Sequence, residues 1–112
     1  MNDATDNRLL RMFIGESDRY DGRPLYEAIV ETLRREGLAG ATVLRGIEGF
    51  GKSSHLHTAN ILRLSEDLPI VIECVDSAEK IEAILPTLDS MIGDGLVTME
   101  RVEVRVYRAN GD

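Results

Sequence analysis

The sequence predicts an α+β fold, ferredoxin-like βαββαβ, in which two helices cover one face of a four-stranded antiparallel sheet. Two segments carry apolar residues at helical spacing, and the short apolar or alternating segments beside them are typical of strands. The chain also repeats itself, because "REGLAGATVLRG" and "MIGDGLVTMERV" both pass through a glycine turn into a strand. Two such halves give the split βαβ arrangement.

The first half begins with a strand. Arg8–Gly15 is short and apolar and is followed by the turn-rich stretch "GESDRYDGR". Pro24 opens the first helix, where its missing N–H costs nothing, and the glycine of "RREG" ends it. The predicted buried stripe of this helix comprises Leu25, Ala28, Ile29, Thr32 and Leu33. Residues 41–50 are then predicted to form the second strand, with Val43 and Ile47 facing inward.

A polar loop separates the two halves. The stretch "GKSSHLHTAN", residues 51–60, is too polar for a core, and extended structure resumes in "PIVIECV" at residues 69–75. Ser77 is predicted to cap the second helix. The buried stripe of that helix comprises Ile81, Ile84, Leu85, Leu88 and Ile92. Pro86 lies within the stripe and predicts a kink or an earlier end to the helix.

The last predicted strand follows a glycine turn. "GDG" at residues 93–95 forms the turn, and residues 96–107 alternate in polarity over Val102, Val104 and Val106. One face of the resulting sheet carries many apolar residues, and no third layer is predicted to cover it. We therefore expect copies of the chain to associate through this face.

Length and composition narrow the class of protein. The 112 residues are predicted to form one domain at residues 8–108, with flexible tails at residues 1–7 and 109–112. A net charge of −7 argues against a nucleic-acid binder, which needs clustered Lys and Arg. No apolar stretch approaches the ~20 residues that span a bilayer, so no membrane insertion is expected. Cys74 is the single cysteine, and with no export signal it indicates a reducing, cytoplasmic location.

The stretch "GIEGFGKS", residues 46–53, matches the phosphate-loop pattern G-x-x-x-x-G-K-[ST] in every letter. Its surroundings do not match, because no clear helix follows it and no second strand ends in a good magnesium ligand. We therefore expect no nucleoside-triphosphate hydrolysis. Gly46, Gly49 and Gly51 have two equally weighted explanations: their N–H groups form a nest for an anion, or they allow the strand to bend.

An acidic turn before the first helix is the one candidate for catalysis. Glu16, Asp18, Tyr20 and Asp21 crowd this turn, and paired carboxylates can do acid–base chemistry. A solvated acidic turn is the favoured explanation of these residues, and no serine–histidine, cysteine–histidine or metal triad is visible. We therefore expect that the protein is not an enzyme.

Nearly the whole chain resembles a known group of proteins. "GIEGFG" and "LPTLDSMIGDGLVTMERVEV" are the most specific segments of a similarity that covers residues 8–108. They are similar to the PII-like bacterial family catalogued as a domain of unknown function, a branch of the PII/CutA-like trimeric ferredoxin-like proteins. The resemblance implies a cytoplasmic homotrimer that binds a small ligand in the clefts between its subunits and signals to a protein partner.

The resemblance also implies which residues bind the ligand and which contact the protein partner. In PII proteins a mobile arm, the T-loop, contacts the partner, here implied to be a transporter or an enzyme. The implied base of this loop binds the ligand and comprises Gly49, Phe50, Gly51 and Lys52. The implied body of the loop contacts the partner and comprises Ser53, Ser54, His55, Leu56, His57 and Thr58. The other implied ligand-binding residues are Gly93, Asp94, Gly95 and Arg105.

Two positions depart from the family pattern. Leu96 stands where PII proteins have a basic residue after the glycine turn, and Tyr107 stands where they have a second arginine. Each lost charge-assisted contact is worth about 1.5–3 kcal/mol, so binding of a triphosphate is expected to weaken. The expected ligand is therefore AMP, ADP, ATP or a cyclic nucleotide, with ATP the least favoured of them, and no cofactor is required.

A divalent-metal-binding module of the CutA type is the alternative function. His55 and His57 alternate in the loop, so both rings would face one side of an extended segment. Two histidines are too few for a closed site, although a trimer could supply three copies. Solvated loop histidines are the simpler explanation of this pattern.

Overall fold

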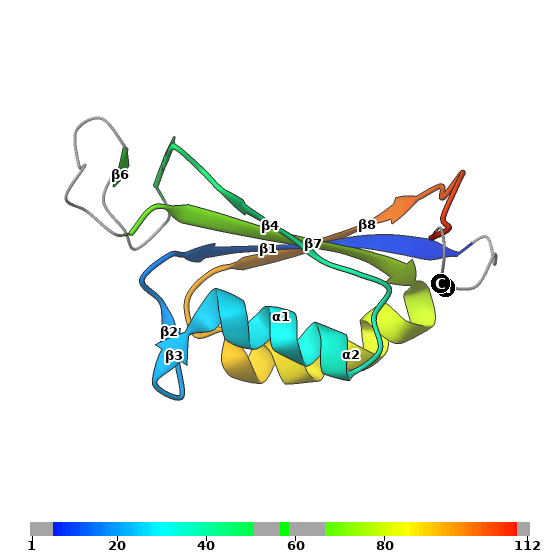
Figure 1. The fold of residues 1–112 in the computed structure, drawn as a ribbon, viewed down its shortest axis with the longest axis horizontal. Coiled ribbons are helices and arrows are strands. Elements are labelled where there is room, and N and C mark those ends of the chain that lie inside the picture. The colour runs from blue at the N-terminus through cyan, green and yellow to red at the C-terminus, as the bar shows by residue number, and fades with distance from the viewer. Residues whose placement is uncertain (1–5, 51–56, 59–66, 110–112) are drawn as a thin grey trace.

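The computed structural model describes residues 6–50, 57–58 and 67–109 and shows an antiparallel sheet with two helices on one face (Figure 1). The sheet has the order β4-β7-β1-β8. Its strands are β1 (Asn7–Gly15), β4 (Thr42–Arg45), β7 (Pro69–Ser77) and β8 (Leu96–Val102). The helices are α1 (Leu25–Arg35) and α2 (Ala78–Met91). This is the predicted α+β, ferredoxin-like arrangement.

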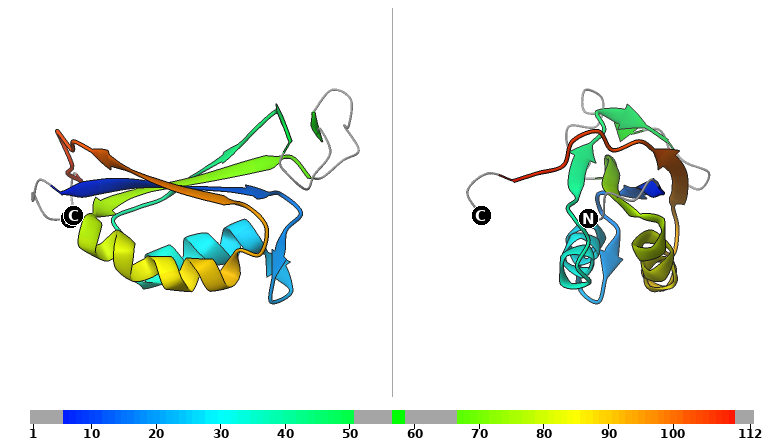
Figure 2. Two further views of the ribbon diagram at one scale, coloured as in Figure 1. Left: turned by 180° about the vertical axis from the view of Figure 1, so that it is seen from behind. Right: turned by 90° about the vertical axis from the view of Figure 1, so that its right-hand side faces the viewer.

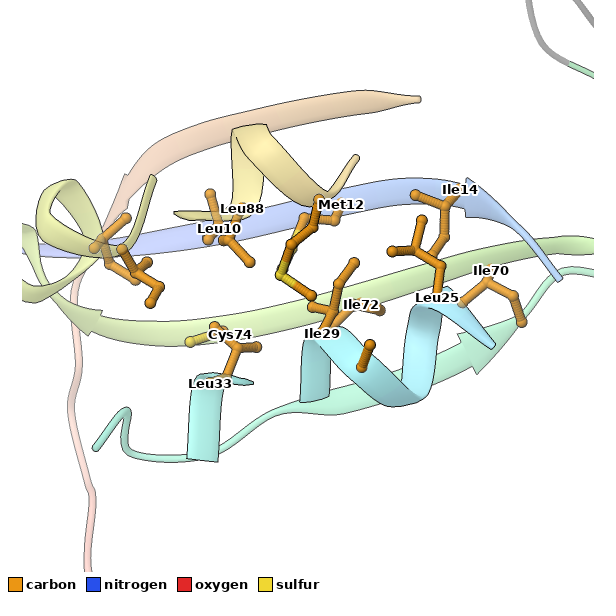
Figure 3. Close-up of a cluster of buried hydrophobic side chains, with 14 residues drawn as sticks. Leu10, Met12, Ile14, Leu25, Ile29, Leu33, Ile70, Ile72, Cys74 and Leu88 are labelled. Carbon is orange, nitrogen blue, oxygen red and sulfur yellow. The ribbon is translucent and has the colours of Figure 1, made fainter. Parts of the chain in front are cut away.

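The core lies between the sheet and the helices (Figure 3). The sheet contributes alternate residues of its two inner strands, namely Leu10, Met12, Ile14, Ile70, Ile72 and Cys74. Both predicted helical stripes are confirmed as core-facing, although Leu85 and Ile92 are only partly buried, and Met91 joins them. Burial raises the pKa of the Cys74 thiol to about 11, so this cysteine is a packed thiol rather than a reactive one.

The helix ends follow the predicted signals closely. Pro24 occupies the N-cap position of α1, one residue before the helix begins, and Gly37 follows its C-cap with φ +84°. Ser77 caps α2, where its hydroxyl accepts a hydrogen bond from the Lys80 N–H at 3.3 Å. The predicted early end at Pro86 is wrong, because α2 continues to Met91. The proline ring is exposed, and the buried residues around it anchor the helix to the sheet.

A short hairpin before α1 was not predicted. It consists of β2 (Arg19–Tyr20) and β3 (Arg23–Pro24). Asp21 and Gly22 connect the two strands, with φ of 53° and 81°. An Asp-Gly pair with positive φ at both residues is the signal of a two-residue hairpin, so the sequence contained this information.

The predicted strand over residues 41–50 is interrupted. Strand β4 ends at Arg45, and β5 (Glu48–Gly49) leaves the sheet to pair with β6 (His57–Thr58). The break shifts the alternation of side chains, so Ile47 is 78% exposed and its predicted inward orientation is wrong. Val43 lies opposite the buried Ile72 but on the edge strand, where 38% of it remains exposed.

The last strand is shorter than predicted. Strand β8 ends at Val102, and residues 103–109 have no regular secondary structure. Val106 is 63% exposed, so the predicted alternation does not continue. The Tyr107 hydroxyl instead donates a hydrogen bond to the Ala39 carbonyl oxygen at 3.2 Å, which ties this segment to the connection before β4.

The second face of the sheet, which we call the open face, lies opposite both helices (Figure 2). Strand alternation and register place the following side chains on it: Leu9, Arg11, Phe13, Thr42, Leu44, Val71, Glu73, Val75, Leu96, Thr98 and Glu100. Its centre is charged, because Arg11 contacts Glu73 at 2.8 Å and Glu100 at 3.3 Å. The open face is therefore an apolar surface around one ion-pair network.

Candidate functional site

A groove of about 680 Å³ opens on the side of the sheet away from the helices. We call it the C-terminal groove, because residues 102–107 form one wall of it. Residues 39–42 form another wall, and residues 73–75 and Leu9 form the floor. Its volume is within the range of sites that hold small ligands, which is about 300–1,000 Å³. Most of its lining is apolar, with Thr42, Glu73, Arg105 and Tyr107 among the polar contributors.

The two walls are held by hydrogen bonds that begin at a buried carboxylate. Asp76 is 1% exposed and accepts hydrogen bonds from the Ala39 N–H at 2.9 Å and the Ser77 N–H at 2.7 Å. The Ala39 carbonyl in turn accepts from Tyr107. Two backbone donors satisfy the carboxylate, which a buried charge requires. Asp76 therefore positions the wall. Sequence reasoning did not predict this role; the available signal was an acidic residue near the end of an apolar strand.

The electrostatics of the groove are dominated by paired groups. Glu73 lies on the floor, and its hydrogen bond with Arg11 raises the pKa of the guanidinium, which stays charged at all physiological pH. Arg105 lies on the rim, 3.7 Å from Glu103, and both side chains are more than 80% exposed. The groove thus combines apolar walls, one fixed carboxylate and one accessible guanidinium.

Gly49, the first residue of the implied loop base, lies at the same end of the sheet as the glycine turn. Gly46 and Gly49 pack against the ring of Pro69, the first residue of β7, which lies opposite Gly15 in β1. Gly95 lies against the neighbouring backbone of Phe13. Figure 1 shows both segments at the left of the molecule and the C-terminal segment at the right.

Arg105 lies at the other end. Strand β8 places Val102 opposite Asn7 in β1, so the residues that follow are a full strand length from the glycine turn. A single chain therefore places Gly49 and the glycine turn at one end of the sheet and Arg105 at the other. Phe50 is 77% exposed, so it has no core role within one chain.

Several predicted residues cannot be compared with the structure. Gly51, Lys52 and residues 53–56 lie outside the described residues. His57 and Thr58 form β6, of which only the backbone is described. The loop body and the alternative His55–His57 metal site therefore stay predictions. Within residues 6–50 and 67–109, no cluster of three or more His, Cys, Asp or Glu is placed to hold a metal ion.

The structure separates the two explanations of the glycine-rich stretch at Gly46. There it favours glycines that allow the strand to bend over N–H groups that form an anion-binding nest. The Gly46 N–H donates a hydrogen bond to the Pro69 carbonyl oxygen at 2.7 Å, so it is not open to an anion. A Cβ at either Gly46 or Gly49 would come within 3.0 Å of the Pro69 ring. The antiparallel sheet also differs from the parallel sheet that carries a phosphate loop.

The acidic turn has structural roles. Asp18 accepts a hydrogen bond from the Gly15 N–H at 2.9 Å, and its own carbonyl accepts from the Leu25 N–H at 2.8 Å. Glu16 forms an ion pair with Arg45. The Asp18 contacts hold the end of β1 against the start of α1, and the ion pair joins Glu16 to the end of β4. Two of the carboxylates are thus accounted for without catalysis.

The glycine turn offers a matched pair of substitutions. We expect Gly95→Ala to lower the free energy of unfolding by about 1–3 kcal/mol, because its Cβ would lie 2.7 Å from the Phe13 carbonyl oxygen. Gly93→Ala is the control, since no neighbouring atom lies within 4 Å of the position that its Cβ would take, and we expect a change within about 0.5 kcal/mol. Urea denaturation measures both, and equal effects would contradict the assigned contact.

Sequence comparisons show relatives along nearly the whole chain. The family model DUF190, described as Uncharacterized ACR, COG1993, matches residues 7–104. A UPF0166 protein of Aquifex aeolicus is 38% identical over 97 residues, which cover 87% of this chain and 91% of that protein. A UPF0166 protein of Methanocaldococcus jannaschii is 38% identical over 102 residues, which cover 90% and 92%.

Two solved structures share the fold. CPII, a nitrogen regulatory PII-like protein from Thiomonas intermedia K12 bound to ADP, AMP and bicarbonate, matches with a TM-score of 0.59 and 18% identity over 90% of this chain and 92% of CPII. The divalent ion tolerance protein CutA1 from Ehrlichia chaffeensis matches with a TM-score of 0.58 and 8% identity over 93% and 86%. None of these names carries an enzyme activity. Neither helix of the described part of the chain is long and apolar enough to cross a membrane.

Proposed function

The chain belongs to the DUF190 family, and from this premise we propose that it is a PII-like signalling protein that binds an adenine nucleotide between the subunits of a homotrimer. The C-terminal groove carries this proposal. It offers apolar walls, the Tyr107 ring and the Glu73 carboxylate within one concave surface. A nucleotide base needs such a surface, because its faces are apolar and its edges form hydrogen bonds.

The location of the groove supports a site shared between copies. It opens on the open face, where Leu44 and Leu96 are 49% and 55% exposed. Covering these side chains with a second copy would bury apolar area and close the groove from outside. The same contact could bring the glycine turn of one copy toward the groove of another, which the fold of one chain does not do.

The similarity to CPII supports the choice of ligand. CPII shares the fold and binds ADP and AMP. In the present chain the ligand-binding residues would be Gly49, Phe50, Gly51, Lys52, Gly93, Asp94, Gly95 and Arg105. We further propose that occupancy changes the order of the loop between β5 and β6, and that a protein partner, a transporter or an enzyme, recognises this loop.

Calorimetry with AMP and ADP tests the nucleotide proposal. We expect one ligand per subunit, and we expect Thr42→Trp to weaken binding at least about tenfold, because an indole at this exposed, groove-lining position would fill the groove. Thr87→Trp on α2 is the matched control and should bind as the unmodified chain does. The proposal fails if no adenine nucleotide produces heat or raises the unfolding temperature.

The same calorimetry also tests the alternative function, a divalent-metal-binding module. Zinc added without nucleotide should produce no binding if the histidines are solvated loop residues. Zinc uptake that is lost in both His55→Ala and His57→Ala would favour the divalent-metal module instead.

A further inference from the structure

We infer that the C-terminal groove selects its ligand by charge, so that it takes a nucleoside monophosphate and rejects the triphosphate. This inference rests on the proposed function and specifies the ligand of the same site. Three features of the described residues carry it: the charges that line the groove, the apolar surface between the groove and the glycine turn, and the pairing of the one guanidinium in the centre of the open face.

The described lining of the groove carries more negative than positive charge, although Arg11 outside this lining is paired with Glu73. Among its described lining residues, Glu73 and Glu103 are carboxylates and Arg105 is the single cation. Arg105 is itself 3.7 Å from Glu103, which offsets part of its attraction for a phosphate. A phosphate that approaches Arg105 therefore also approaches a carboxylate. One phosphate can be held by the guanidinium, but further phosphates meet no second cation among these residues.

Among the described residues, the surface between the groove and the glycine turn offers no further cation. From Glu73 toward the glycine turn, the described side chains of the open face are Phe13, Leu44, Val71 and Leu96, all apolar. Arg11 is the only cation among the described open-face residues, and it already contacts two carboxylates. A polyphosphate extended along these four apolar side chains would lose hydration without gaining an ion pair from them, which is unfavourable.

The expected size of the preference for AMP over ATP follows from the solvent exposure of the charged side chains on the rim. Because Glu103 and Arg105 are mostly in contact with water, screening limits their influence on a ligand. We expect AMP to bind at least about fivefold more tightly than ATP at low salt, which corresponds to about 1 kcal/mol. ADP should lie between them. The preference should fall below about twofold in 1 M salt, where the Debye length is only about 3 Å.

Calorimetric titration of AMP, ADP and ATP into the full chain tests the inference, without added divalent cations and at about 0.02 M and 1 M salt. Glu103→Lys exchanges a rim carboxylate for a cation and should make ATP bind at least as tightly as AMP at low salt. Glu82→Lys is the matched control, since Glu82 is an exposed residue of α2 on the helical side of the sheet. It should keep the preference for AMP.

The outcomes separate this inference from the proposed function. ATP binding as tightly as AMP to the unmodified chain would overturn charge selection and leave nucleotide binding intact. A preference for AMP that persists in 1 M salt and in Glu103→Lys would also overturn it, because selection would then be steric. Failure of all three nucleotides to bind would overturn both proposals.

Discussion

Leu44→Asp is expected to convert the proposed homotrimer into single folded chains. Leu44 is 49% exposed and lies on the open face opposite Val71. If copies associate through this face, the substitution places an unpaired carboxylate in an apolar interface, which costs several kcal/mol. The fold itself should tolerate the change, because the residue lies on the edge strand and is half in contact with water.

Sedimentation velocity at micromolar concentration measures this result. Ala83→Asp is the control, since Ala83 is exposed on α2 and lies on the opposite side of the sheet from Leu44. It should sediment as the unmodified chain does, and circular dichroism should show that both variants are folded. A Leu44→Asp protein that remains assembled would show that the open face is not the contact between subunits.

Ile72→Ala is expected to lower the free energy of unfolding by about 2–5 kcal/mol. Ile72 is completely buried at the centre of the core, on a strand that pairs with both β1 and β4. Removing its side chain beyond Cβ leaves a cavity that strands paired on both sides cannot collapse to fill. Such a loss is a large part of the roughly 5–15 kcal/mol that stabilises a typical domain.

Val43→Ala provides the control for this prediction. Val43 lies directly opposite Ile72 but is 38% exposed on the edge strand, so the expected loss is about 1 kcal/mol or less. Urea denaturation should be done at one fixed protomer concentration, because assembly makes apparent stability depend on concentration. Equal losses in the two variants would mean that Ile72 is not at the packed centre of the core.

The sequence predicted those elements whose patterns are long and regular. Helices α1 and α2 and strands β1 and β7 each carry many apolar residues at one period, so local pattern and tertiary burial agree. The predictions failed where the pattern was short. The Asp21–Gly22 hairpin occupies only a few residues, and Ile47 is apolar yet exposed because the strand ends before it.

The candidate site was less accessible to sequence reasoning. Its walls depend on contacts between distant residues, such as the hydrogen bond from Tyr107 to Ala39, and no local pattern encodes such a contact. The family resemblance implied that the glycine turn and Arg105 bind the ligand. It could not show that one chain holds them at opposite ends of the sheet. Their proposed meeting requires a second copy, which the pattern of one chain does not describe.

The position of β4 has a consequence for the proposed signalling function. This strand has four residues and joins the groove wall at Ala39–Ala41 to the Gly46–Gly49 segment that begins the loop. It pairs only with β7, so a small sliding of one strand along the other would alter both regions together. If the proposed function holds, thermodynamic reciprocity requires that a protein partner bound to the loop changes nucleotide affinity by the same factor by which the nucleotide changes affinity for the partner.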